Sequence, residues 1–364
     1  MLEESEILSL IAIGLIPGIG PRKARKIIEL SGSASEFFRS AEKLNLAGVR
    51  TEDLRQNHLK AYLRKAEDEL KYNQRHGITS LHFKQKEFPF RLKSCEDGPL
   101  VIFTRGNLDL NASRIVSIVG TRTATDYGER VCEELVSELA ELRCALVSGL
   151  AHGIDSFAHR AAQSRGIQNI GVVAHGLDAL YPPGNRSLAR SMEENGGIVT
   201  DFMIATRPDR ENFPKRNRII AGLCDATIVV EAAKKGGALI TAELALSYNR
   251  DVFAVPGRIG DLTSQGCNML IKNNRAALLN SASDLAWYMG WEKKSRKPVQ
   301  VSLFETLSES ETRVVSLIKN GKNHPDLILA NSGFSSSALA GILLDLEFKG
   351  IIRAMPGKTY TVIS

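Results

Sequence analysis

The chain has 364 residues, of which 43% are hydrophobic and 24% are charged, and its formal net charge is +6 at pH 7. These values are ordinary for a globular protein of two or three domains and argue against a disordered chain. The five cysteines are widely spaced without a C-x-x-C pair, so we expect neither a disulfide framework nor a zinc knuckle. The first residues lack the basic start of a signal peptide, and no apolar run approaches the roughly 20 residues that span a bilayer. We therefore expect a cytoplasmic protein without a membrane segment.

Residues 1–80 are predicted to form a helical domain. Glu6 to Gly14 has helical apolar spacing, and Glu67 to His76 is a charged helix. Between them, the glycines of Pro17-Gly18-Ile19-Gly20 precede a basic amphipathic helix. This pattern predicts a helix-hairpin-helix, in which Gly18, Gly20 and Lys23 contact the sugar-phosphate backbone without reading bases. The alternative is a plain glycine turn between two packed helices.

Residues 81–290 alternate between buried strands and amphipathic helices. The predicted strands are 114–119, 145–148, 170–174, 198–202, 227–230 and 252–255, and the predicted helices are 126–142, 154–165, 187–195, a helix opening at 216–218, and 238–249. Continuous Val and Ile runs separated by helices predict an α/β fold with a parallel sheet covered on both faces. Ligands of such sheets bind at the carboxyl ends of the strands, so the loops that follow the strands are the candidate sites.

A polar, basic linker is expected at 291–307, and residues 308–364 form the last predicted domain. Three short helices, 311–319, 325–330 and 335–349, precede two strands, 351–355 and 359–363, that flank Pro356-Gly357-Lys358. This order predicts a winged helix. Its third helix is serine-rich and only weakly basic, which argues against sequence-specific reading of DNA. The domain therefore either contacts DNA in another way or binds another protein.

The loop after the first strand of the sheet is Gly120-Thr121-Arg122. It matches neither the G-x-G-x-x-G dinucleotide pattern nor a P-loop. A glycine turn with free amides, a hydroxyl and a guanidinium can nevertheless hold a phosphate, and arginine can do so bidentately. The loop after the second strand offers Ser148, Gly149 and Gly153 to the start of a helix in the same way.

Later loops add cations at the same predicted edge. Arg186 closes the loop that begins at Tyr181, and Lys235 lies in a Lys-Lys-Gly-Gly turn. The stretch FPKRNRIIAGL places Arg216, Asn217 and Arg218 at the start of a helix, where donors and the helix dipole favour an anion. The alternative for this stretch is an arginine-rich surface exposed to solvent.

The loops carry little that could catalyse a reaction. They contain neither a nucleophile matched to a base nor a pair of carboxylates in an acid–base arrangement. His152, Asp155 and His159 are too few for a metal site, and Asp155 is expected to cap its helix or pair with a neighbouring cation. We therefore expect an edge that binds phosphates, with no catalytic residues, no metal and no cofactor.

Six motifs in order resemble those of the DprA/Smf family, the bacterial DNA-processing proteins of natural transformation. They are IVGTR at 118–122, SGLAHGIDSFAH at 148–159, GLDALYPPGN at 176–185, FPKRNRIIAGL at 213–223, VVEA at 229–232 and FAVPG at 253–257. The resemblance extends over the whole chain, because the flanking helical and winged-helix domains also fit.

The resemblance implies an extended Rossmann-like domain that binds single-stranded DNA. It further implies a homodimer that protects incoming strands and loads RecA recombinase onto them, with single-strand-binding protein as a further partner. Carried over by motif, the DNA-binding residues include Arg122, Arg186, Arg210 and Phe213. Lys235-Gly236-Gly237-Ala238 departs from the Ser-Gly-Ser turn of many relatives, and its lysine adds positive charge.

Two other classes of function stay open. Gly236-Gly237 with Thr241 and Glu243 weakly resembles the loop of Rossmann-like nucleotide phosphoribohydrolases, although the spacing differs by one residue. A pure interaction scaffold is the other class, but it leaves the loop arginines without a role.

Overall fold

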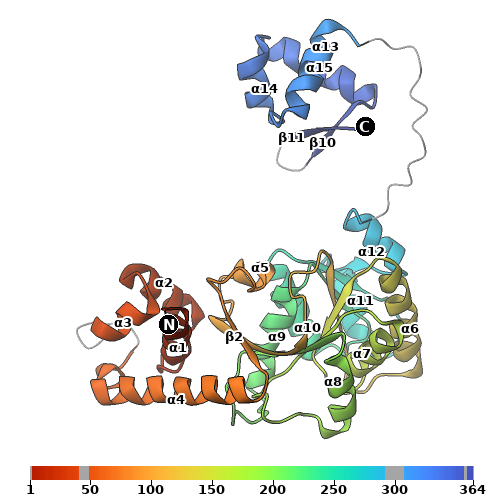
Figure 1. Cartoon of the computed structure of the whole chain (residues 1–364). Helices are drawn as coiled ribbons and strands as arrows, with labels where there is room; N and C mark the ends of the chain where they lie inside the picture. Colours follow the sequence, from red (N-terminus) through yellow and green to blue (C-terminus); the bar gives the residue numbers. More distant parts are fainter. Residues whose placement is uncertain (1, 41–48, 292–306, 356–358, 364) are drawn as a thin grey trace. The chain divides into compact units, whose positions relative to one another are not determined.

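The computed structural model describes residues 2–40, 49–291, 307–355 and 359–363, and the chain forms two compact units, Met1–Glu292 and Lys293–Ser364 (Figure 1). The predicted linker at 291–307 and the turn Pro356-Gly357-Lys358 lie almost wholly outside the described residues. The division of residues 1–290 into a helical and a sheet domain stays a prediction.

The described part of the first unit is built on a nine-stranded sheet, with the order β1-β2-β6-β5-β4-β3-β7-β8-β9. The strands are β1 (Thr79–His82), β2 (Val101–Asn107), β3 (Ile115–Val119), β4 (Ala145–Ser148), β5 (Asn169–Val172), β6 (Gly196–Thr200), β7 (Ala226–Val229), β8 (Asp251–Ala254) and β9 (Ala277–Leu278). From β6 to β9 the neighbouring strands are parallel. The predicted doubly wound α/β fold is confirmed.

One edge of the sheet differs from the prediction of a parallel sheet. β2 pairs antiparallel with both β1 and β6, and β1 and β2 were not predicted at all. Thr79–His82 has only four residues, and one of them, His82, is a buried polar residue. Such a short segment lacks the continuous Val and Ile pattern by which the central strands were found.

Helices cover both faces of the sheet, as predicted. They are α6 (Asp126–Glu141), α7 (Ile154–Arg165), α8 (Arg186–Met192), α9 (Asn212–Leu223), α10 (Gly237–Ser247), α11 (Gln265–Lys272) and α12 (Ala282–Tyr288). Alternate residues of β3 enter different cores, because successive side chains of a strand point to opposite faces. Ile115 and Val119 pack with α9 and α10, whereas Val116 and Ile118 pack with α6 and α7.

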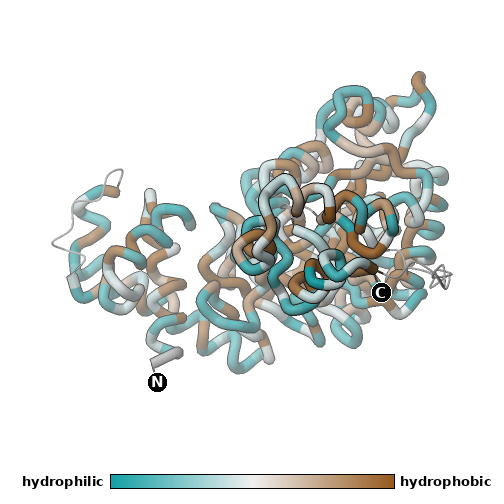
Figure 2. Tube along the Cα trace, turned by 90° about the horizontal axis from the view of Figure 1, so that it is seen from above, coloured by the Kyte–Doolittle hydropathy of each residue, from teal (hydrophilic) through white to brown (hydrophobic). Residues whose placement is uncertain are grey.

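The N-terminal helices pack against the antiparallel edge. They are α1 (Leu2–Gly14), α2 (Pro21–Ser31), α3 (Ala34–Ser40) and α4 (Gln56–Arg75). Hydrophobic and hydrophilic residues are mixed along these helices, as expected for helices with one buried face (Figure 2). The buried side, including Leu10 and Ile27, shares a core with Val101 and Phe103 of β2. A short helix, α5 (Phe90–Lys93), precedes β2.

The basic helix of the predicted hairpin is α2, and two of its cations contact the sheet part of the unit. Arg25 donates to the carbonyls of Lys93 and Gly98 at 3.1 and 3.2 Å, and Arg22 pairs with Glu96 at 2.7 Å. Lys23 donates to the Gly18 carbonyl at 2.7 Å. Arg25 is thereby held against the segment before β2, whereas the Arg22–Glu96 pair lies at the surface.

The second unit contains the elements predicted for a winged helix. They are α13 (Glu309–Lys319), α14 (Pro325–Ser332), α15 (Ser336–Phe348), β10 (Ile352–Met355) and β11 (Thr359–Val362). The third helix, SSALAGILLDLEF, contains no lysine or arginine and carries Asp345 and Glu347. It therefore offers no cation to a DNA phosphate.

All five cysteines are free and buried. Burial raises the pKa of the thiols of Cys144 and Cys267 to about 12.

Among the described residues, no single helix is both long and apolar enough to cross a membrane, although α14 and α15, bent by 117°, pass that test as a pair by length and composition only.

Candidate nucleic-acid interface

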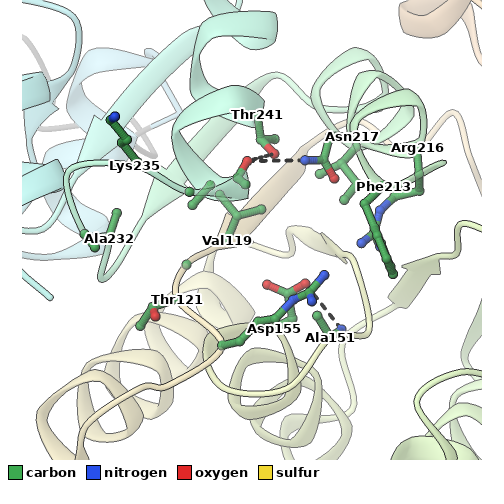
Figure 3. Close-up of a pocket in the computed structure, with 17 residues that line it drawn as sticks. Val119, Thr121, Ala151, Asp155, Phe213, Arg216, Asn217, Ala232, Lys235 and Thr241 are labelled. Carbon is green, nitrogen blue, oxygen red and sulfur yellow. Dashed lines mark hydrogen bonds between the residues drawn. The ribbon is translucent and has the colours of Figure 1, made fainter. Parts of the chain in front are cut away.

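A cavity of about 290 Å³ lies at the carboxyl ends of β3 and β7. The chain runs from β3 to β6 toward one edge of the sheet and from β7 to β9 toward the other, so the strand order reverses between β3 and β7. Ligands of doubly wound sheets bind at such a reversal. We call this space the switch-point cavity; it is lined by loop 120–122, residues of α9 and the turn before α10 (Figure 3).

The loop after β3 is held so that Arg122 is presented at its tip. The Thr121 amide donates to the Glu231 carbonyl at 2.7 Å, and the Thr121 carbonyl accepts from the Ile154 amide at 3.2 Å. A side chain at Gly120 would place its Cβ 2.4 Å from Ile154, so only glycine fits. Arg122 is exposed beyond this anchored turn, and no described carboxylate forms an ion pair with it.

Phe213, in the first turn of α9, lies beside two guanidinium groups. The Cζ atom of Arg122 is 4.8 Å from the centroid of its ring, and that of Arg216 is 5.9 Å away. The ring of Tyr181 lies 6.4 Å from the same centroid. Arginine over an aromatic face is an attractive arrangement, and the same planar groups can stack on a nucleobase.

Arg216 lines the cavity but is buried, with 4% of its surface exposed. Its Nη1 atom donates to two carbonyls, that of Gly149, which directly follows β4, and that of Val172, the last residue of β5. Burial lowers the pKa of its guanidinium to about 10, and Nε has no hydrogen-bond partner among the described residues. Arg216 therefore fastens two strand ends together beneath the cavity.

Asp155 compensates this buried cation. Its Oδ2 atom accepts from the amides of Gly149 and Ala151 at 3.1 and 3.4 Å. Burial raises the pKa of the Asp155 carboxyl, whereas the charge of Arg216 acts in the opposite direction. The charge of Arg216 thus acts on Asp155 without a direct ion pair between the two side chains, and the predicted pairing of Asp155 with a neighbouring cation stays a prediction.

The opposite wall of the cavity is the start of α10. No side chain caps this helix. The first backbone amides of α10 and the positive end of its dipole are therefore unoccupied by a side chain at the Gly236-Gly237 turn. Asn217 and Thr241 fix the turn by donating to the Gly237 carbonyl at 3.2 and 3.1 Å. Lys235 is exposed at the edge of the same turn. The wall offers amides and one cation to an anion.

The structure brings most of the predicted site residues together, but not all. Those lining the switch-point cavity are Gly120, Thr121, Arg122, Phe213, Arg216, Asn217 and Lys235. Ser148, Gly149 and Gly153 lie beneath it as support, and the Ser148 hydroxyl donates to the Ile118 carbonyl at 2.6 Å.

The remaining predicted residues lie elsewhere. Arg186 begins α8 and Arg210 precedes α9, and both are exposed. Arg218 faces away from the cavity and pairs with Asp201. Gly18, Gly20 and Lys23 belong to the α1–α2 hairpin. Whether these residues contact nucleic acid stays a prediction.

Thr241 and Glu231 were not predicted as binding-site residues. Thr241 lines the cavity and holds the turn before α10. The Glu231 carboxylate accepts from the amide and the hydroxyl of Thr125 at 3.0 and 2.6 Å, which fixes the chain just before α6. The sequence signal that could have identified Glu231 is a carboxylate directly after the apolar strand residues of the VVEA motif.

The other candidate chemistries are not assembled at the cavity. Glu243 does not line it and instead pairs with Arg275. His159 is buried against Asn169, with its Nδ1 atom 2.5 Å from Oδ1, whereas His152 is exposed. In the described ranges, no group of three His, Cys, Asp or Glu side chains could hold a metal ion.

A doubly wound sheet with glycine-turn amides, cations and an aromatic ring at its switch point is typical of α/β proteins that bind phosphate-bearing ligands. The model of one such family, DNA recombination-mediator protein A, matches residues 79–290, and the model of the DprA winged helix domain matches residues 303–358. The chain belongs to the DNA recombination-mediator protein A family.

Individual relatives agree with this assignment. The DNA processing protein DprA of Bacillus subtilis is 40% identical over 210 residues, which cover 57% of this chain and 70% of the relative. The crystal structure of DprA from Streptococcus pneumoniae is 31% identical, with a TM-score of 0.67, over 78% of this chain and 96% of that chain.

A structure of DNA processing protein A from Helicobacter pylori, solved for its single-stranded DNA binding mode, is 27% identical. Its TM-score is 0.53, over 58% of this chain and 95% of that chain.

Proposed function

We propose that this protein binds single-stranded DNA at the switch-point cavity and delivers the strand to RecA recombinase during DNA uptake and recombination. The observation that carries the proposal is the Arg122 guanidinium over the Phe213 ring at the switch-point cavity. Unpaired bases expose faces that can stack on aromatic rings and guanidinium planes, and duplex bases do not. The H. pylori relative described by its single-stranded DNA binding mode supports the same ligand class.

The rest of the cavity suits the backbone of the strand. Exposed Lys235 and the uncapped start of α10 offer positive charge and amides to a phosphate. These groups recognise phosphate and not base identity, so binding is expected to be largely independent of sequence. A mediator needs this property, because it must hold any incoming strand whatever its sequence.

Further parts of the proposal rest on family membership. We expect a homodimer, since two linked strand-binding sites raise the effective concentration of strand at the second site. We also expect a cytoplasmic location and strands already coated by single-strand-binding protein. The winged helix is proposed as a protein-binding module, because α15 offers acidic and apolar residues and no cation.

The enzymatic alternative gains no support from the cavity, because Glu243 is engaged by Arg275 and lies outside the lining. The deciding experiment measures fluorescence anisotropy with a labelled single strand and with a blunt duplex of equal length, beside a nucleotide-hydrolysis assay. We expect the single strand to bind more tightly and Arg122→Ala to weaken it. Arg64→Ala, which removes an exposed arginine of α4, is the matched control. Equal affinity for both DNA forms, or turnover of nucleotides, would refute the proposal.

A further inference from the structure

A second cavity, of about 380 Å³, lies on the other side of α9. Lys215 and Arg218 of α9 line it, whereas Phe213, Arg216 and Asn217 line the switch-point cavity. Residues about two positions apart on a helix point to opposite sides, which explains how one helix serves both spaces. We call the second space the hairpin cleft, because its other walls are the α1–α2 hairpin and strand β2.

The walls of the hairpin cleft are apolar and fastened in place. Its lining includes Leu15 and Ile19 of the hairpin, Phe103 of β2, and Met203. The contacts of Arg22 and Arg25 with residues 93–98 hold the hairpin against the sheet. A preformed apolar slot of this kind can accept a flat, weakly polar group such as a nucleobase.

One cation at this cleft has no carboxylate partner. Arg218 is committed, since it pairs with Asp201 and donates to the Asp97 carbonyl. Lys215 is exposed, and no described carboxylate pairs with it. Because the Arg218–Asp201 pair is neutral, Lys215 gives the rim of the cleft a net positive charge.

We propose that a strand held in the switch-point cavity passes around the first turn of α9 and seats a further nucleotide in the hairpin cleft, with its base against the apolar walls and a phosphate at Lys215. The exposed Arg207 and Arg210 precede α9 in the chain. The distance is short, because a helix with its side chains is only about 10–12 Å across. This inference rests on the proposed function, since it extends the path of the same strand.

Single-stranded DNA is the occupant that fits both features. A base needs apolar walls and its phosphate needs a cation, and the hairpin cleft offers these together. A duplex offers no free base to such a slot. The hairpin thereby gains a role in binding through its apolar side.

The test uses oligothymidylates from about 4 to about 16 nucleotides, the range of site sizes on single-strand-binding folds. Wild-type affinity is expected to rise stepwise once the strand is long enough to cross α9, by about 5- to 150-fold for one seated base. Gly14 lines the cleft and nothing lies within 4 Å of a Cβ there, so Gly14→Trp introduces a bulky side chain at the cleft without a clash at its Cβ. Gly14→Ala is its control, and Lys65→Ala, on α4, is the control for Lys215→Ala.

We expect Gly14→Trp and Lys215→Ala to bind short strands like the wild type and to lack the increase in affinity seen with long strands. Wild-type affinity from both variants at every length, or equal weakening at every length, would overturn the second seat. If Arg122→Ala leaves the affinity for every length unchanged, the proposed function itself fails. Thermal melting checks that each variant is folded. If Gly14→Trp does not fold, Lys215→Ala alone decides the test.

Discussion

Arg122, in the loop after β3, lies over the ring of Phe213, in the first turn of α9, with 4.8 Å between its Cζ atom and the ring centroid. Two sites of the sequence that lie far apart thus bring a guanidinium and an aromatic ring together at the switch-point cavity. Because each residue positions the other, their contributions to binding are expected to be coupled.

The first prediction concerns the aromatic ring. Phe213→Leu should weaken binding of a single strand by about 1–3 kcal/mol, the range for losing one stacked base. Phe213→Tyr, which keeps the ring, should bind nearly as well as the wild type. Anisotropy titrations of both variants at one fixed salt concentration test this. Equal affinities for the leucine and tyrosine variants would show that no base stacks here.

The second prediction concerns salt dependence. Arg122→Ala should reduce the slope of log affinity against log salt by about 0.7 for each phosphate of a single strand that the arginine neutralises in the wild type. Arg122→Lys should keep the slope but bind more weakly, because lysine lacks the planar fork of the guanidinium. Titrations across a series of salt concentrations measure the slope. If the alanine variant retains the wild-type slope, Arg122 does not neutralise a phosphate.

The third prediction concerns the buried pair beneath the cavity. Arg216→Ala leaves Asp155 without its cation and should reduce the free energy of unfolding by about 3–5 kcal/mol. Adding Asp155→Asn should restore part of this stability, because the unpaired buried charge is removed. Urea denaturation of the two variants and the wild type gives these values. Additive destabilisation in the double variant would mean that the two residues do not interact.

The fourth prediction concerns pH. Burial lowers the pKa of His159 to about 4, from an ordinary value of 6.5, so between these values the unfolded chain binds a proton that the folded chain does not. The stabilisation is therefore complete above pH 6.5 and is lost as the pH falls toward 4. In His159→Gln, the free energy of unfolding should decrease less over this interval than in the wild type. Parallel curves for both proteins, from urea denaturation at each pH, would contradict the buried neutral state.

The fifth prediction concerns RecA. Wild-type protein should stimulate strand exchange by RecA on DNA coated with single-strand-binding protein, and the double variant Arg122→Ala, Phe213→Ala should stimulate it less. The reason is that delivery requires the strand to be held first. Absence of stimulation by the wild type over a range of salt would remove the mediator role while leaving strand binding intact. Equal stimulation by the double variant would assign the role to another surface.

The central sheet and the core of the site could be predicted from the sequence because the rules involved are local. Continuous Val and Ile runs indicated the parallel strands, and the rule for strand ends selected Gly120 to Arg122. The side of a helix that a residue faces depends on packing. Arg216 and Arg218 are two positions apart, yet one is buried beneath the switch-point cavity and the other pairs with Asp201 across the hairpin cleft.

The functions of the hairpin cations were also beyond sequence reasoning. Arg22 and Arg25 look like phosphate ligands in an amphipathic basic helix, but their partners, Glu96 and the carbonyls of Lys93 and Gly98, are distant in sequence. The strands β1 and β2 were also missed: β1 has only four residues, and the apolar run that opens β2 has no helical segment of regular pattern before it that would have marked it as part of the alternating strands and helices.

The burial of all five cysteines makes the chain convenient for spectroscopy. A thiol must ionise to react with maleimide or iodoacetamide reagents, and the buried groups are shielded from solvent and have raised pKa values. A cysteine introduced at an exposed position beside the binding cations, such as Lys234 next to Lys235, would therefore be the reactive thiol in an otherwise native sequence. One dye on either side of α9 could then follow, in real time, in which order a strand arrives at the two spaces.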